Sequence, residues 1–430
     1  MLPKVNKGSE TEELVEKICT NMFFSDFTVR NPKYKKGGKA EKEAADILIP
    51  FEDKLIAIQV KSKAESKKVN EKTDLDFQRI KKVIGEGIEQ LKTIKRALGN
   101  NWIVELTTVR GYKIPFDCRS IKKIIGMVIF DLIGEEVFME EERTSIINGF
   151  DYKHDMPVHI FRRSDFEAIS SEIDTLPDFL EYLKIREEFF KRGLFRAPIY
   201  ELDFLALYKT KPDILERAIG SNSHILIEEG TWKYYKKTLR KTIKRRDFLK
   251  QPSYLIDIAI NELHSSVGFD HRENILSSIP LTVPPGSLES YLAICYELAR
   301  IPRLQRRLIG ERFIRCLKQA NQEIGFGYSF VALDELGERG VLVLSTKSGR
   351  TERTKMLYNL CAMVYCALEL KQVVGIVTEP LTGYGRSFDF IILRDIEFDN
   401  CDELIALFEK TFGKRHTATF AEYIETEESK

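Results

Sequence analysis

The sequence lacks the features of membrane and secreted proteins. No apolar run in its 430 residues approaches the ~20 residues that a membrane-spanning helix needs. The N-terminal residues Met1-Leu2-Pro3-Lys4 include no apolar segment of the kind found in secretory signals. The seven cysteines are scattered and form no Cys-x-x-Cys pair, which argues against a zinc ribbon and a disulfide framework. We therefore expect a cytoplasmic protein without a membrane partner.

Two further absences narrow the function. No Gly-rich loop ending in Lys-Ser or Lys-Thr is present, which argues against an ATPase of the common phosphate-loop type. The six histidines show no metal-ligand spacing, so a histidine-based metal site is not expected.

Charge is balanced overall but uneven along the chain. The sequence has 67 Lys and Arg against 66 Asp and Glu. Basic residues nevertheless concentrate in residues 33–72, 233–250 and 300–318, whereas residues 395–430 are acidic. Such segments can bind a polyanion, or they can simply be solvated helix faces.

The order of apolar patterns predicts a mixed α/β protein with three regions. Residues 1–150 combine helical and strand patterns, residues 151–325 look mainly helical, and residues 326–430 return to α/β. In the first region we expect a helix, a β-hairpin, a long helix and further strands, at 9–23, 45–49 with 55–60, 75–98, 102–109 and 124–133.

The third region repeats part of this order. Two strands around a turn are followed by a helix at 351–370 and strands at 373–378 and 388–393. A degraded duplication and a common βαβ-like pattern both explain this. Ser345-Thr346-Lys347 ends a strand much as Gln59-Val60-Lys61 does, but with Ser345 in the place of Gln59 a duplicated site would lack a ligand.

The sharpest chemical signal lies on the first hairpin. Asp46 begins one strand, and Gln59 and Lys61 end the next. The start of one hairpin strand lies beside the end of its partner, so these three residues can converge at one edge. Gln59 and Lys61 are two residues apart and leave the same face.

This set of side chains suits metal-assisted phosphodiester hydrolysis. Mg²⁺ prefers oxygen ligands, which the Asp46 carboxylate and the Gln59 amide supply. Mg²⁺ or Mn²⁺ would activate a water and polarise the phosphate, while Lys61 stabilises negative charge. Alternatively, Asp46 is a turn residue and Lys61 a lysine that ends a strand.

Asp46, thirteen residues, then Gln59-x-Lys61, after a Glu-bearing helix, resembles the PD-(D/E)xK nuclease superfamily. The Gln-x-Lys form resembles its Mrr-type restriction endonuclease branch. The resemblance covers about residues 8–135 and implies an α-β-β-β-α-β core, with Phe27-Thr28-Val29-Arg30 as the first strand. Ala45 stands where the literal motif has Pro.

The resemblance also implies a glutamate on the first helix. Glu10, Glu12 and Glu13 compete for this role, and Glu12 falls at the border of the apolar stripe, where it can reach the sheet edge. We choose Glu12 as a catalytic and metal-binding residue; the alternative is that it only completes a capping box with Ser9. Glu43 is a further candidate acid.

Two basic segments are candidates for binding nucleic acid. Lys35, Lys36 and Lys39 precede the Asp46 strand and would meet phosphates, unless they only form a charged surface loop. In residues 233–246, Tyr235, Leu239 and Ile243 form an apolar stripe on one expected helix. Its basic residues suit a phosphate backbone or an acidic protein surface, and the candidates are Lys237, Arg240, Lys241 and Lys244.

These patterns favour a metal-dependent nuclease acting on DNA. By analogy, such a domain on a helical body resembles bacterial restriction or anti-phage proteins. Two alternatives stay open: an RNase, and an inactive scaffold that binds nucleic acid or protein. A homo-oligomer or protein partner through the helical and C-terminal regions is also expected.

Overall fold

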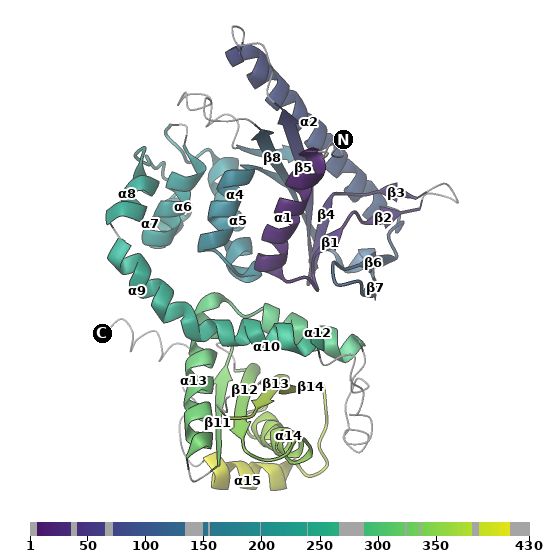
Figure 1. Ribbon diagram of the computed structural model, residues 1–430, viewed down its shortest axis with the longest axis vertical. Helices are drawn as coiled ribbons and strands as arrows, with labels where there is room; N and C mark the ends of the chain where they lie inside the picture. The colour runs from purple at the N-terminus through teal and green to yellow at the C-terminus, as the bar shows by residue number, and fades with distance from the viewer. Residues whose placement is uncertain are drawn as a thin grey trace, which may run out of the picture. The chain divides into compact units, whose positions relative to one another are not determined.

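The computed structural model describes most of the chain and divides it into two compact units, Met1–Lys241 and Thr242–Lys430, called unit 1 and unit 2 (Figure 1). The described residues are 7–35, 41–64, 72–133, 149–153, 155–197, 199–238, 240–265, 288–322, 325–334, 337–380 and 387–412. Both units are mixed α/β, as the sequence predicts.

Unit 1 is built on a six-stranded mixed sheet of order β1-β4-β5-β8-β10-β9. Its strands are β1 Val29–Arg30, β4 Ile47–Phe51, β5 Lys54–Ala64, β8 Lys123–Ile133, β9 Gly149–Lys153 and β10 Met156–Arg162. β5, β8 and β10 run parallel, and the other neighbours are antiparallel. The predicted hairpin is thus β4–β5, and it joins β8 after the long helix.

Helices cover both faces of this sheet. On one face lies α2, Lys72–Gly99, whose Ile80, Ile84, Ile88 and Leu91 recur at helical spacing and pack in one core with Leu55 and Ala57 of β5. The alternate β5 residues point to the other face, where α1 Lys7–Phe23 packs. α4 Arg163–Glu172 and α5 Leu176–Arg192 share that face with α1.

Two small ribbons lie at the β1 edge of unit 1 (Figure 1). One pairs β2 Lys33–Tyr34 with β3 Lys42–Glu43, and the other pairs β6 Glu105–Thr107 with β7 Lys113–Pro115. The strand expected at residues 102–109 therefore exists only as β6, outside the main sheet. A 3₁₀ helix, Cys118–Ser120, precedes β8.

The first part of the middle region belongs to unit 1, which corrects the boundary expected at residue 150. β9 and β10 complete the first sheet, and buried Arg186 of α5 ties the helices to it. The Arg186 guanidinium donates to the Gly149 carbonyl at 3.0 Å and pairs with Glu201 at 2.9 Å. The remaining helices of this unit are α6 Glu201–Thr210, α7 Pro212–Ser221 and α8 Thr231–Thr238. α9, Arg240–Lys250, spans the boundary between the units.

Unit 2 holds a four-stranded sheet of order β11-β12-β13-β14. Its strands are β11 Phe326–Ala332, β12 Arg339–Thr346, β13 Gln372–Thr378 and β14 Phe388–Arg394, and only β12 and β13 run parallel. α13 Arg303–Asn321 packs on β11 and β12, and α14 Arg350–Ala367 packs with β12, β13 and β14. The unit also contains the 3₁₀ helix Gln251–Ser253, α10 Tyr254–Ser265, α12 Leu288–Ala299 and α15 Cys401–Phe412.

Candidate active site

The candidate site lies where β4 begins and β5 ends. Antiparallel pairing runs from Ile47 opposite Ile58 to Phe51 opposite Lys54. The Asp46 backbone N–H continues the ladder by donating to the Ile58 carbonyl at 3.2 Å. The pairing therefore brings Asp46 beside the second half of β5, as hairpin geometry predicts.

Asp46, Gln59 and Lys61 come together at this edge. The Lys61 ammonium lies 3.9 Å from Asp46 Oδ2, and both side chains are 18% exposed. The same ammonium donates to Gln59 Oε1 at 3.3 Å, and Gln59 is only 4% exposed. The three residues chosen from the sequence thus form one contact network, in which Asp46 and Lys61 are partly exposed and Gln59 is buried.

The Asp46 carboxylate is held by the backbone but incompletely compensated. The Val60 N–H donates to Asp46 Oδ2 at 2.5 Å. Burial raises the pKa of Asp46, and the Val60 N–H and Lys61 offset that rise only in part. A positive charge bound at this edge would therefore stabilise the ionised carboxylate.

Glu12 of α1 lies within the electrostatic field of this network. Burial raises the pKa of Glu12, and the negative charges of Asp46 and Glu43 raise it further, while Arg30 and Lys61 act in the opposite direction. Glu10 and Glu13 are exposed, whereas Glu12 is half-buried. Of the three competing glutamates, Glu12 is the least exposed, and the charge of Asp46 contributes to its raised pKa.

Two contacts hold α1 on either side of Glu12. Thr11 Oγ1 donates to Asp131 of β8 at 3.4 Å, and Glu16 pairs with Arg30 at 3.0 Å. α1 begins at Lys7, so Ser9 lies in its first turn and not at the N-cap. The capping-box alternative for Glu12 is therefore wrong.

Glu43 is a third acid in the same field. It lies on exposed β3, and burial, followed by the charge of Asp46, raises its pKa. Burial is thus the main cause of the raised pKa of all three carboxyls, and repulsion from Asp46 adds to it for Glu12 and Glu43.

The oxygen donors Asp46, Gln59 and Glu12 have the chemistry that Mg²⁺ or Mn²⁺ prefers. Within the described part of the chain, no three Asp, Glu, His or Cys side chains stand close enough to hold a metal ion. The candidate set contains two carboxyls and an amide, with the Lys61 ammonium between the oxygens of Asp46 and Gln59.

A glycine that sequence reasoning missed lies under Lys61. A Cβ built on Gly87 of α2 would stand 3.0 Å and 3.3 Å from the two methyl carbons of Val128 and 3.6 Å from Lys61 Cγ. Gly87 thus allows α2 to approach the sheet beside the lysine stem. Gln90, also on α2, is exposed.

The candidate phosphate-binding lysines are only partly described. Lys35 is exposed and pairs with Glu41 at 3.1 Å, whereas Lys36 and Lys39 lie outside the described residues. The other basic segment forms two helices, α8 and α9, where the sequence suggested one.

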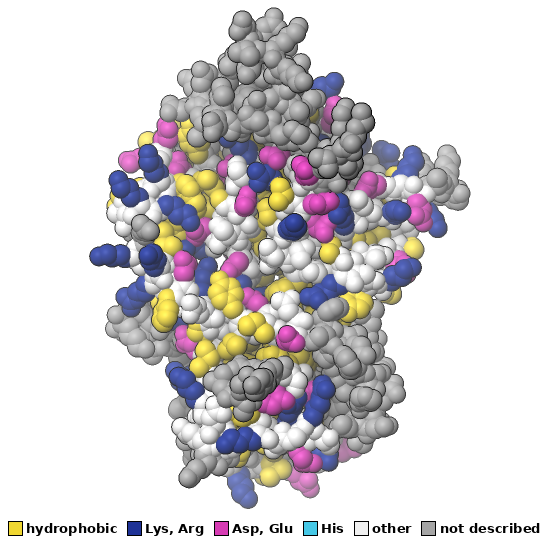
Figure 2. Space-filling view, viewed as in Figure 1, with side chains coloured by type: hydrophobic (Ala, Val, Ile, Leu, Met, Phe, Trp, Pro, Cys, Tyr) yellow, Lys and Arg dark blue, Asp and Glu magenta, His cyan; other side chains and the backbone are white. Residues whose placement is uncertain are grey.

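Along this second segment the basic side chains face solvent. Lys237, Lys241 and Lys244 are exposed, and Arg240 begins α9. Tyr235 is buried and donates to Glu172 at 2.9 Å, Ile243 is half-buried, and Leu239 lies outside the described residues. Figure 2 shows Lys and Arg side chains gathered over α8.

Comparison with known proteins gives no match: no family model, no curated protein and no solved structure is similar to this chain. None of the helices in the described ranges is both long and apolar enough to cross a bilayer.

Proposed function

We propose that the chain is a metal-dependent nuclease that hydrolyses phosphodiester bonds in DNA. The observation that carries the proposal is the contact network of Asp46, Gln59 and Lys61, with Glu12 in its field. A largely buried acid beside a lysine, with a second carboxyl in its field, is the arrangement that a divalent cation and a phosphate would complete.

The order of elements supports a restriction-endonuclease-like core. Along the chain, the elements of the first part of the main sheet follow in the order α1, β1, β4, β5, α2 and β8, and β1, β4, β5 and β8 are neighbours in that order in the sheet. That order agrees with the α-β-β-β-α-β core implied by the resemblance, and it adds support independent of the motif itself.

Each residue has a distinct part in the proposed reaction. Asp46, Gln59 and Glu12 would hold Mg²⁺ or Mn²⁺, which supplies a water of lowered pKa and polarises the phosphate. The Val60 N–H fixes the orientation of the Asp46 carboxylate. Gln59 orients Lys61, whose ammonium stabilises the charge that develops on the phosphoryl oxygens.

The test is cleavage by the full chain of plasmid, linear DNA and RNA, with Mg²⁺, with Mn²⁺ and in EDTA. Asp46→Asn should abolish cleavage, and Asp53→Asn should not, because Asp53 lies at the opposite, turn end of the same hairpin and pairs with Lys54 and Lys122. Full activity in EDTA would rule out the metal mechanism. Cleavage of RNA alone would assign the enzyme to the RNases, and cleavage of nothing would leave a binding scaffold.

The exposed basic residues of α8 and α9 support a nucleic-acid partner. Changing Lys237, Lys241 and Lys244 together to Glu should weaken DNA binding and reduce the slope of log K against log salt by roughly 0.9 for each lost phosphate contact. A change in oligomeric mass at unaltered DNA affinity would instead make this segment a protein-binding surface. A bacterial restriction or anti-phage role is the setting we propose for such an enzyme.

A further inference from the structure

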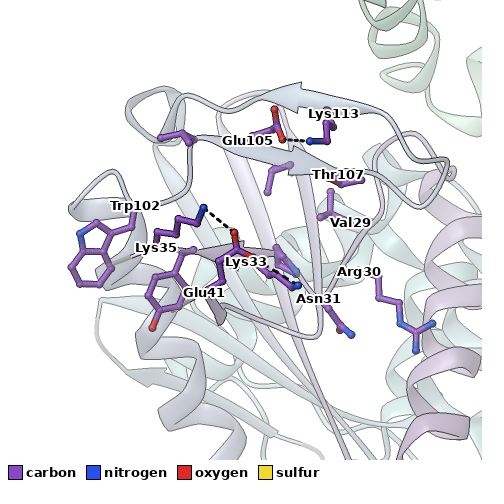
Figure 3. Close-up of a pocket in the computed structure, with 14 residues that line it drawn as sticks. Val29, Arg30, Asn31, Lys33, Lys35, Glu41, Trp102, Glu105, Thr107 and Lys113 are labelled. Atoms are coloured by element: carbon purple, nitrogen blue, oxygen red, sulfur yellow. Dashed lines mark ion pairs between the residues drawn. The ribbon is translucent and has the colours of Figure 1, made fainter. Parts of the chain in front are cut away.

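A pocket of about 570 Å³ opens between the two small ribbons at the β1 edge of unit 1. Its walls are the β2–β3 ribbon on one side and the β6–β7 ribbon on the other, as Figure 3 shows. The volume lies in the ~300–1,000 Å³ range of small-molecule sites. Of the site residues chosen from the sequence, Lys35 is the one that lines this pocket.

The pocket is connected to the candidate active site through the backbone and through one arginine. The Asn31 N–H, at the pocket, donates to the Asp46 carbonyl at 2.9 Å. Arg30 lines the pocket, and its positive charge offsets part of the rise in the pKa of Glu12 and of Glu43. A strand bound at Asp46 would therefore have its next nucleotides within reach of this opening.

The lining combines positive charge with aromatic and exposed apolar surface. Three lysines line the pocket with two acids: Lys33 and Lys35 pair with Glu41, and Lys113 pairs with Glu105. Arg30 also lines the pocket, but its guanidinium pairs with Glu16 of α1. Figure 2 shows Lys and Arg side chains over these ribbons with apolar side chains between them. This net positive lining favours an anionic ligand.

The apolar part of the lining has the form of a stacking platform. Trp102 is partly buried against the core of unit 1 and stacks on Tyr34, with ring centroids 5.7 Å apart and planes 9° from parallel. Val104, on the same side, is 65% exposed, which is unusual for a large apolar side chain in a pocket. Aromatic surface beside lysines is the combination that binds unpaired bases together with their phosphates.

We propose that this pocket binds an unpaired nucleotide of the strand that enters the active site. The base lies against Trp102 and Val104, and the lysines of the two ribbons contact its phosphates. The inference deepens the proposed nuclease function and rests on it for the strand's identity as substrate. The pocket thus selects substrates with a single-stranded segment or an opened base pair next to the scissile phosphate.

The chain contains two tryptophans, Trp102 and Trp232, so Trp232→Phe leaves Trp102 as the only indole reporter. In this variant of the full chain, in EDTA, we expect a ten-nucleotide oligothymidylate to quench the emission of Trp102 saturably. A blunt duplex of the same length should bind at least about fivefold more weakly, because its bases cannot stack on the platform.

Two exposed valines of the same loop-and-ribbon segment give a matched control. Val104→Asp, in the pocket, should weaken oligothymidylate binding by about tenfold. Val109→Asp, at a residue that is 37% exposed and outside the pocket lining, should leave binding within about twofold of the parent. Lys35→Glu should weaken binding and lower its salt dependence. Melting temperatures of all three variants establish that they are folded.

The outcomes separate the two proposals, because binding in EDTA needs no catalysis. Cleavage that depends on Lys61, together with no saturable quenching or with equal effects of Val104→Asp and Val109→Asp, overturns the pocket and leaves the nuclease. Specific quenching without cleavage of any substrate supports the pocket and overturns the nuclease.

Discussion

The two units repeat one arrangement but differ in how they neutralise charge at the corresponding edge. In each, a β-hairpin is followed by a helix and a strand parallel to the second hairpin strand: β4–β5–α2–β8 in unit 1 and β11–β12–α14–β13 in unit 2. At the unit 1 edge, burial and mutual repulsion raise the pKa of Glu12 and of Asp46's neighbour Glu43. At the unit 2 edge, the pKa of a carboxyl is lowered instead.

Two arginines satisfy the carboxylates at the unit 2 edge. Arg353 is 2% exposed and contacts Asp389 at 2.6 Å, Glu379, and Ser387 at 2.6 Å. Burial alone would raise the pKa of Glu379, but hydrogen bonds from Ser387 and Arg353 outweigh it and lower the pKa to about 2. A closed edge of this kind stabilises the fold, whereas the buried carboxyl of Asp46 in unit 1 is only partly compensated, so that a bound cation would stabilise its ionised form.

A glycine in each parallel strand gives a reference position from which residues of the two units can be matched. A Cβ on Gly126 of β8 would meet Leu91 of α2 at 2.9 Å, and one on Gly375 of β13 would meet Cys361 of α14 at 2.6 Å. Gly126 lies opposite Ala57, and Gly375 lies opposite Leu342.

Counting two and four residues onward from these partners matches Gln59 with Leu344 and Lys61 with Thr346. Through the hairpin registers it also matches Asp46 with Tyr328. Unit 2 therefore shares the hairpin–helix–strand arrangement of unit 1 and none of its three candidate site residues.

The largest effect that sharpens this contrast is expected from Arg353→Ala. The change leaves the buried Asp389 without its main partner and should lower the free energy of unfolding by about 3–5 kcal/mol. Urea denaturation measures it. Arg350→Ala is the matched control, because Arg350 is 46% exposed and pairs with Asp389 at the surface, so its loss should cost about 1 kcal/mol or less.

The same network predicts a pH dependence of stability. Because the folded state lowers the pKa of Glu379 from 4.5 to about 2, its stabilisation is present above 4.5 and is lost as the pH falls toward 2. Glu379→Gln should therefore flatten the acid limb of the stability curve. An acid limb identical to that of the parent would show that the network does not close this edge.

The next effect is on catalysis. Lys61→Ala should reduce the cleavage rate by about 10²–10³-fold, because it removes the cation nearest to Asp46. The melting temperature should change little. Two substitutions serve as controls: Lys54→Ala, at the start of the same strand β5, and Thr346→Ala, at the position of unit 2 that matches Lys61. Equal losses in Lys61→Ala and Thr346→Ala would break the contrast between the units.

The sequence predicts the unit 1 site well because a hairpin fixes which residues meet. Asp46, Gln59 and Lys61 converge through strand alternation and one tight turn, both of which are local. The comparison of Ser345-Thr346-Lys347 with Gln59-Val60-Lys61 is wrong, because the matched residues lie on opposite faces of their sheets relative to the helix that follows. Lys347 donates to the carbonyls of Asn321 and Gln322 at the end of α13, on the face away from α14. Residues 341–346 are all buried, so the pattern does not reveal which face meets α14.

Other features depend on distant contacts that no local pattern encodes. Residues 156–162 fall in the region expected to be mainly helical, but they form β10, where pairing with β8 and β9 determines the strand. The pocket at the β1 edge lies between two ribbons that are far apart in the sequence. The strands of these ribbons are only two or three residues long. One link between them is the Val109 N–H, which donates to the Thr28 carbonyl at 2.8 Å.

A smaller effect concerns Asp46 itself. Because folding raises the pKa of Asp46, the carboxylate costs stability as the pH rises through that pKa, and nothing is lost below its ordinary value of 3.8. Asp46→Asn without metal should therefore melt at or above the parent temperature at pH 8, and the difference should vanish near pH 3.5. Saturating Mg²⁺ should raise the melting temperature of the parent more than that of Asp46→Asn. A lower melting temperature of Asp46→Asn in EDTA at pH 8 would make Asp46 a structural residue.

The smallest effect is expected from the glycines of α2, a feature that α14 lacks entirely. Gly85 and Gly87 lie two residues apart, and a Cβ on Gly85 would meet nothing within 4 Å. Gly85→Ala should therefore stabilise the chain by up to about 1 kcal/mol through helix propensity. Gly87→Ala gains the same propensity, but its Cβ presses on Val128 and the stem of Lys61, so its net stability change should be near zero. Because Lys61 must keep its position, cleavage by Gly87→Ala should fall severalfold while Gly85→Ala cleaves at the parental rate. Paired measurements of urea denaturation and cleavage rate decide the matter: equal stabilisation and full activity in both variants would show that the close approach of α2 plays no part in placing Lys61.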